Sequence, residues 1–264
     1  MIKINVGFMK FINDNNLFLL EELVKKNFTS KYKGSVLGIF WTILNPLLMM
    51  VLFTIIFSTL FSRNIENYPV YFLCGWCLFQ FFSSSVRASM VALSGNKSIL
   101  QRTPAPKHIF VLASILSEFL NLLIIFVLLI GIIIITHAPI YWSLMPFSLF
   151  PIISLIIMVV GLGLMLSVIC VYYSDVQYLW NILSMMLMYA SAIFYPMTVI
   201  PKPYYSYLIL NPLFWIIDQF RCFIYHGIVP EVGYMMNSLL LSLIILVIGI
   251  IVFKKYEDKV TMKF

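Results

Sequence analysis

The sequence has 264 residues, of which 62% are hydrophobic and 10% are charged, and its formal net charge is +7. A soluble domain carries about 25% charged residues, and a chain of this length could not hide so much apolar surface in a water-soluble fold. The composition therefore indicates a chain that lies mostly in lipid. The basic residues lie at the ends of apolar segments rather than in one stripe, so we expect no nucleic-acid partner.

The first predicted element is an amphipathic helix at residues 17–28. Its apolar face is formed by Leu17, Leu20, Val24 and Phe28. Its polar face carries two oppositely charged pairs spaced four residues apart, Glu21 with Lys25 and Glu22 with Lys26. Because it precedes the first apolar span, we expect it to lie in the cytoplasmic membrane interface. A solvated leader helix is the alternative.

Six apolar segments are long enough to cross a bilayer, which takes roughly 20 residues per helix. Residues 119–174 carry no Asp, Glu, Lys or Arg. As one helix they would extend about 84 Å, so the chain must turn back, and residues 137–146 are the natural turn. We predict an all-α integral membrane protein whose single domain, residues 1–264, has spans at about 35–61, 68–92, 109–136, 147–170, 176–194 and 232–253.

The distribution of basic residues predicts the orientation of these spans. With a cytoplasmic N-terminus, the inner segments hold 13 Lys and Arg residues and the outer loops hold three. Basic residues are enriched in cytoplasmic loops. We therefore expect a multi-pass protein of the cytoplasmic (inner) membrane with both termini in the cytoplasm and residues 137–145 and 195–231 outside.

The outer segment 201–231 resembles neither a span nor an ordinary loop. Between Lys202 and Asp218 it has 15 uncharged residues, too few to cross, and it contains Pro203 and Pro212. It is also rich in aromatic residues, which are typical of membrane interfaces. We predict re-entrant helices between the fifth and sixth spans; an interfacial aromatic belt is the alternative.

Ionisable residues near or inside the spans provide further expectations. Glu118 lies within the third span, where a charged residue needs a partner, and we expect a structural pair between Arg87 and Glu118. Asp175 begins the fifth span and is expected to cap that helix. Cys74 and Cys77 form a Cys-x-x-Cys inside an apolar helix, where simple packing is the favoured interpretation. His108, His137 and His226 are too far apart to indicate a metal or catalytic site.

Short motifs occur in order along the chain, near the ends of the predicted spans. They are residues 30–38 (SKYKGSVLG) with Trp41 and Asn45-Pro46, residues 96–100 (NKSIL), 173–176 (YSDV), 194–196 (FYP), 210–213 (LNPL) and Phe220-Arg221. Together they resemble the motifs of ABC type-2 permeases that export lipid-linked polysaccharides, over about residues 17–255. The resemblance favours the O-antigen or teichoic-acid branch of that family.

This resemblance implies the membrane subunit of an ATP-driven exporter, assembled as a homodimer with two copies of a separate ATPase. ATP and Mg would bind that partner, because this sequence has no Gly-x-x-x-x-Gly-Lys-[Ser/Thr] motif. The chain itself is then expected to hold no cofactor, metal or catalytic residue. Two alternatives stay open: an ABC type-2 permease for a small molecule or lipid, and a membrane-embedded enzyme of glycan assembly.

The resemblance also assigns expected roles to individual residues. Contact with the ATPase is expected at Glu21, Glu22, Lys25, Lys26, Asn96 and Lys97. The phosphates of a lipid carrier are expected to meet Lys31, Lys33 and Arg102, because these side chains are cationic. The glycan pathway is expected to be lined by Trp41, Asn45, Trp180, Asn181, Tyr189 and Tyr195, although Trp and Tyr at span ends also serve as plain interface anchors.

Overall fold

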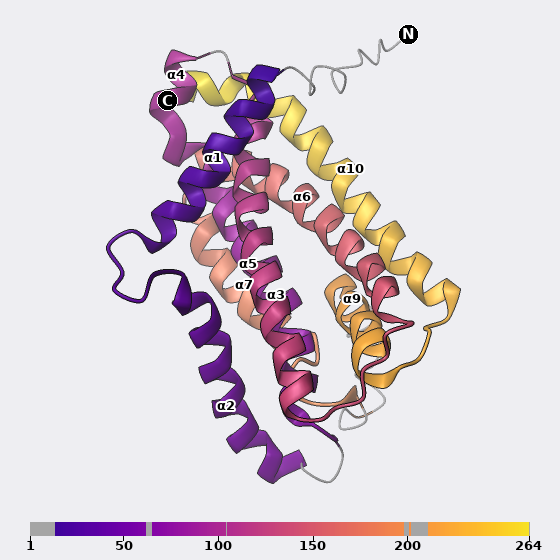
Figure 1. Cartoon of the computed structure of the whole chain (residues 1–264). Coiled ribbons are helices and arrows are strands. Elements are labelled where there is room, and N and C mark those ends of the chain that lie inside the picture. Colours follow the sequence, from indigo (N-terminus) through magenta and orange to yellow (C-terminus); the bar gives the residue numbers. More distant parts are fainter. Residues whose placement is uncertain (1–13, 62–64, 104, 198–200, 202–210, 264) are drawn as a thin grey trace.

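A computed structural model describes residues 14–61, 65–103, 105–197, 201 and 211–263. All regular elements of these segments are helical (Figure 1). They are α1 (Asp14–Tyr32), the 3-10 turn η2 (Gly38–Phe40), α2 (Trp41–Phe61), α3 (Tyr68–Ala92), the 3-10 turn η3 (Ser94–Asn96), α4 (Lys97–Arg102), α5 (Lys107–Ile135), the 3-10 turn η4 (Met145–Ser148), α6 (Leu149–Tyr172), α7 (Val176–Ala190), α9 (Pro212–Arg221), the π-helix η7 (Cys222–His226) and α10 (Val232–Lys263).

Five of the described segments are long and apolar enough to cross a membrane. They are Gly38–Phe57, Tyr68–Ala92, Lys107–Ile135, Met145–Tyr172 and Val232–Val260. These segments confirm an all-helical membrane protein and overlap five of the six predicted spans. The predicted span 176–194 corresponds to α7, which has 15 residues. At 1.5 Å per residue α7 is about 22 Å long, shorter than the roughly 30 Å hydrocarbon core of a bilayer.

The centre of the bundle is α3, which packs against α5, α6, α2 and α9. Within its most apolar stretch 78% of the residues are buried, against 11% in α2. Phe72, Leu73 and Phe82 of α3 are almost completely enclosed. In contrast, α2 stands at the edge of the bundle and presents much of its apolar surface outward (Figure 1).

The last long helix, α10, packs along α6 through glycine. A Cβ atom on Gly161 would lie 2.6 Å from the Cα of Leu246 in α10, and one on Gly249 would overlap the backbone of Gly161. Small residues at such crossings let helix backbones approach closely in membranes. The two glycines therefore fix how closely these helices meet.

The amphipathic helix is longer than expected, since α1 extends from Asp14 to Tyr32. It packs against α5, and its first turns lie at the same end of the bundle as α4 and the end of α10 (Figure 1). The link to α2 contains Gly34 and Gly38, with φ of +82° and +50°. Only glycine adopts such left-handed angles without strain, so these two residues permit the sharp change of direction between α1 and α2.

Part of the predicted outer segment forms a short helix inside the protein. α9 has ten residues, continues directly into η7 and packs against α3, α6 and α10. Asn211 caps it by accepting a hydrogen bond of 3.1 Å from the Leu213 N–H. Its apolar side chains, including Ile216, Ile217 and Phe220, are buried. Residues 202–210, with three of the tyrosines that motivated the prediction, lie outside the described residues.

Candidate functional site

Two adjoining cavities, of about 390 and 700 Å³, lie along α1, α3 and α5. They share the side chains of Lys31, Gln80, Ser84 and Glu118. The smaller cavity extends to the start of α2, and the larger one extends to η3. We call the two cavities together the polar groove, because most of their lining side chains are polar.

At the junction of the two cavities, Lys31 of α1 forms an ion pair with Glu118 of α5. The Lys31 Nζ atom lies 3.1 Å from Oε1 and 2.9 Å from Oε2 of Glu118. The Lys31 side chain is 42% exposed and that of Glu118 is 9% exposed. Glu118 is about 16 Å along α5 from its first residue, at a depth where a carboxylate needs a partner.

This geometry corrects the pairing expected from the sequence. Arg87 also lines the larger cavity, but within the described part of the chain the ion pair of Glu118 is made with Lys31. The reason is tertiary: α1 lies against α5 and brings Lys31 to the carboxylate. The expectation that Glu118 has a cationic partner is confirmed, and the identity of that partner was wrong.

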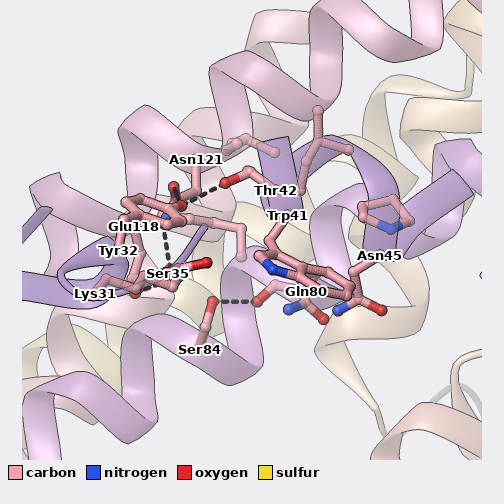
Figure 2. Close-up of a pocket in the computed structure, with 14 residues that line it drawn as sticks. Lys31, Tyr32, Ser35, Trp41, Thr42, Asn45, Gln80, Ser84, Glu118 and Asn121 are labelled. Carbon is pink, nitrogen blue, oxygen red and sulfur yellow. Dashed lines mark hydrogen bonds and ion pairs between the residues drawn. The ribbon is translucent and has the colours of Figure 1, made fainter. Parts of the chain in front are cut away.

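A chain of hydrogen bonds extends from this ion pair to α2 (Figure 2). Asn121 Nδ2 donates to Glu118 Oε2 at 2.9 Å, and Asn121 Oδ1 accepts from the Tyr32 hydroxyl at 2.7 Å. That hydroxyl also shares a hydrogen bond with Thr42, near the start of α2. The network therefore ties α1, α5 and α2 together where α1 ends.

Contacts between α1 and its neighbours line the part of the larger cavity that is nearest to η3. Lys26 Nζ donates to Asn96 Oδ1 at 2.8 Å, and Asn27 Nδ2 donates to Ser114 Oγ at 3.4 Å. The exposed side chain of Arg87 makes no ion pair or hydrogen bond with any residue that the structure describes. The groove thus contains one guanidinium group without a described partner.

The expected pathway residues fall into separate places. Trp41 and Asn45 line the smaller cavity (Figure 2). Trp180 is buried, with its ring 5.6 Å from that of Phe82, whereas Asn181 is exposed on α7.

Two further pathway residues lie near the C-terminal end of α7. Tyr189 is exposed, and its ring is 5.6 Å from Phe194. Tyr195 donates a 2.5 Å hydrogen bond to the carbonyl of Tyr189. Thus the structure brings Trp41 and Asn45 to the polar groove but not the four residues of α7 and its C-terminal turn.

The other expected residues lie mostly on the surface. Glu21, Glu22 and Lys25 are exposed on α1, and Lys97 is exposed on α4. Lys33 and Arg102 are exposed but do not line the polar groove. Asp175 occupies the N-cap position of α7, yet its side chain makes no capping hydrogen bond in the described structure, so the expected capping interaction was wrong.

Most polar residues of the groove were not predicted from the sequence. On α3 these are Gln80, Ser83 and Ser84, and on α5 they are Ser114, Ser117 and Asn121. Together with Arg87 and Glu118 they repeat every three or four residues, the spacing that places side chains on one face of a helix. That polar face inside two apolar helices was the signal that could have revealed the groove.

A second charged cluster lies at the opposite end of α3. Arg221 is buried, and its Nη1 and Nη2 atoms donate to the carbonyls of Ala192 and Ile193 at 2.8 and 2.9 Å. Its guanidinium group lies 3.7 Å from the centre of the Tyr71 ring. Nearby, burial lowers the pKa of His226. This cluster ties α9 to the turn after α7.

The fold and the groove define a class: a polytopic helical membrane protein with a charged groove next to an interface helix. Comparison with known families makes the assignment specific. Residues 19–225 match the family described as ABC-2 type transporter, which is more than half of the chain. The chain therefore belongs to the ABC-2 type transporter family of membrane proteins.

Curated relatives agree with this family over nearly their whole lengths. The chain is 26% identical to the O-antigen export system permease protein RfbA of Myxococcus xanthus over 232 residues, which cover 86% of this chain and 88% of that one. It is 28% identical to the polysialic acid transport protein KpsM of Escherichia coli over 244 residues, or 90% and 93% of the two chains. It is also 20% identical over 249 residues to the capsule polysaccharide export inner-membrane protein CtrC of Neisseria meningitidis, or 90% and 91%.

Proposed function

We propose that this chain is the membrane subunit of an ATP-driven exporter that moves a lipid-linked polysaccharide outward across the cytoplasmic membrane. The observation that carries the proposal is the polar groove, because ionisable side chains inside a helical membrane bundle are costly and rare, and they typically mark a substrate or ion pathway. The printed functions of the relatives, O-antigen, polysialic acid and capsule polysaccharide export, support a glycan as the cargo.

The proposed assembly is a homodimer of this chain with two copies of a separate ATPase, which binds ATP and Mg. The exposed apolar surfaces of α2 and α7 support it. Val51 and Ile55 on α2, and Ile182 and Met186 on α7, point away from the core. A second copy could cover these surfaces and enclose a conduit between subunits, to which Tyr189, Asn181 and Tyr195 would contribute.

The proposed topology has six crossings, with α7 and the turn after it forming the fifth and α9 forming part of a re-entrant segment. The half-length α9, enclosed by other helices, supports this arrangement, because broken backbone at membrane depth must be covered by protein. The positive charges at the end of the bundle that holds α1, α4 and the end of α10 support cytoplasmic termini.

Coupling to the ATPase would use the exposed polar face of α1 together with α4. Glu21, Glu22 and Lys25 are exposed on α1, and Lys97 is exposed on α4. The Lys26–Asn96 hydrogen bond joins these two elements, so that they can move as one surface. Lys33, exposed in the link after α1, and Arg102, exposed on α4, could attract phosphate groups towards the protein.

The experiment is reconstitution of the chain with its ATPase in lipid vesicles, followed by ATP hydrolysis with and without lipid-linked glycan. Stimulation of hydrolysis by the glycan, with transfer to the opposite leaflet, is the expected result. Stimulation of ATP hydrolysis by a small molecule, or by lipid without glycan, would instead favour an ABC type-2 permease for that small molecule or lipid. Covalent change of the glycan by this chain without ATPase would instead establish a glycan-assembly enzyme.

A further inference from the structure

We propose that a third groove, between α1 and α5, binds a membrane phospholipid whose headgroup ends in a primary ammonium group, as in phosphatidylethanolamine. Lys25 binds the phosphate of this lipid and Glu21 binds its ammonium group. The inference goes beyond the proposed function and does not rest on it, because it requires only that the chain lies in a membrane.

The wall of this groove, which has a volume of about 540 Å³, is mostly apolar. We call it the apolar groove; its wall is formed by Leu17, Leu20 and Val24 of α1 and by Leu116, Phe119 and Leu120 of α5. Leu116 and Leu120 are 41% and 39% exposed. They lie about 14 and 20 Å along the spanning helix α5 from its first residue, a depth at which a bilayer contains acyl chains. The apolar groove therefore fits the hydrocarbon part of a lipid.

The apolar groove is separate from the polar groove, and the two share no lining residue. On α5 the polar groove is lined by Ser114, Ser117 and Glu118, whereas the apolar groove is lined by Leu116 and Leu120. Because α1 packs on α5 between the two, a lipid in the apolar groove does not enter the polar one.

The polar residues of the apolar groove are Glu21, Lys25 and Thr29, which follow one another on α1 at intervals of four positions. That spacing places them on one face of the helix, with about 6 Å of axial rise between neighbours. Among the residues that the structure describes, the side chains of Glu21 and Lys25 form no ion pair or hydrogen bond. One carboxylate and one ammonium group, a turn apart, therefore complement a headgroup whose own opposite charges are two carbons apart.

This arrangement of charges selects among phospholipids. A primary ammonium group has three N–H donors and forms a charge-assisted hydrogen bond with a carboxylate. The quaternary ammonium of phosphatidylcholine has no N–H to donate, and phosphatidylglycerol brings no cation to Glu21. Each of these lipids carries a phosphate for Lys25, so Glu21 decides between them and disfavours the anionic lipid by like-charge repulsion.

Glu21 and Lys25 also belong to the surface of α1 that the proposed function assigns to the ATPase. A bound headgroup would become part of that surface. Glu22 lies beside it on α1, exposed and outside the apolar groove, and therefore provides a matched control for Glu21.

The test uses the purified full-length chain in detergent micelles with an equimolar mixture of dioleoyl phosphatidylethanolamine, phosphatidylcholine and phosphatidylglycerol. Native mass spectrometry counts the lipids that stay bound. The wild-type chain should bind phosphatidylethanolamine about threefold more than either competitor, a modest factor because the ion pairs are exposed. Glu21→Gln should remove this preference. Lys25→Gln should lower the binding of all three lipids, and Glu22→Gln should change nothing. Thermal unfolding of each variant verifies that it is folded.

Loss of selectivity at Glu21 and loss of affinity at Lys25 are together the signature of the proposal. Equal binding of the three lipids by the wild-type chain, a preference for phosphatidylglycerol, or an unchanged preference in Glu21→Gln would overturn it. Glu118→Gln tests the place of the site: loss of the preference in that variant would assign the headgroup to the ion pair of the polar groove instead.

Glycerophosphoethanolamine, the same headgroup without acyl chains, tests the apolar wall. It should not displace the bound phosphatidylethanolamine, and competition at equal concentration would overturn the assignment to a lipid. All of these measurements use the chain without ATPase or glycan, so their failure would leave the proposed exporter intact.

Discussion

Lys26 and Asn96, 70 positions apart in the sequence, are joined by a 2.8 Å hydrogen bond between Nζ and Oδ1. Asn96 is buried and also donates to the Ala92 carbonyl at 2.8 Å. The interface helix α1 is thereby fastened to the turn that precedes α4. In the proposed function these are the two elements that meet the ATPase.

This hydrogen bond leads to a prediction that separates attachment of the ATPase from coupling of ATP hydrolysis to export. Asn96→Ala removes the acceptor of Lys26 but leaves the exposed charges of α1 unchanged, so the ATPase should still copurify while export per ATP hydrolysed falls several-fold. Lys25→Glu reverses an exposed charge and should instead reduce copurification. Wild-type copurification and wild-type coupling in both variants would show that α1 is only a membrane leader.

The ion pair of Glu118 can be assigned by double-mutant cycles. Lys31→Met and Glu118→Gln should show a coupling energy of about 1 kcal/mol, modest because Lys31 is partly exposed. Arg87→Met and Glu118→Gln should be additive within about 0.5 kcal/mol. Unfolding of the purified chain by denaturant measures both cycles. A larger coupling energy between Arg87 and Glu118 than between Lys31 and Glu118 would instead support the Arg87–Glu118 pair.

Gly75 is predicted to tolerate no larger side chain, because a Cβ there would lie 2.6 Å from Nη2 of the buried Arg221. Gly75→Ala should therefore lower the free energy of unfolding by about 1–3 kcal/mol. Gly131→Ala in α5 is the control, since a Cβ at that position meets no atom within 4 Å; the change should be neutral or stabilising by up to about 1 kcal/mol. Equal effects on thermal unfolding would contradict the proposed packing.

Cysteine labelling of intact cells tests the proposed orientation. Cys74, Cys77, Cys170 and Cys222 are all buried, so the background should be low. Glu231→Cys, exposed before α10, should react with an impermeant maleimide. Lys259→Cys, exposed near the other end of α10, should react only after permeabilisation. Labelling of Lys259→Cys in intact cells would show that the C-terminal end of α10 lies outside and would contradict the proposed orientation.

Helices could be predicted from the sequence wherever an apolar segment is long or the spacing of its apolar residues is regular. Five spans and the amphipathic helix were predictable because length and hydropathy decide them. The end of α7 was not: the helix stops at Ala190, and Ala192 adopts a positive φ of 49° while its carbonyl accepts from Arg221. That interruption depends on α9, which follows some 20 residues later.

The groove could be predicted only in part for a similar reason. A charged residue inside a span requires a partner, and this made Glu118 recognisable. That its partner is Lys31, 87 positions away, depends on how α1 packs on α5. The spacing of apolar residues in the sequence does not specify that packing. The surroundings of Trp180 were likewise not predictable: its position in α7 suggested a pathway residue, and the fold buries it against Phe82.

In the proposed function, this chain carries a lipid-linked polysaccharide out of the cytoplasm. The most direct measurement is the distribution of that glycan in cells depleted of the chain, using impermeant labelling for surface glycan and lipid extraction for the carrier-linked form. We expect surface glycan to disappear while lipid-linked glycan accumulates on the cytoplasmic leaflet, with both restored by the wild-type chain. Unchanged surface glycan, or loss of the lipid-linked form itself, would contradict the claim.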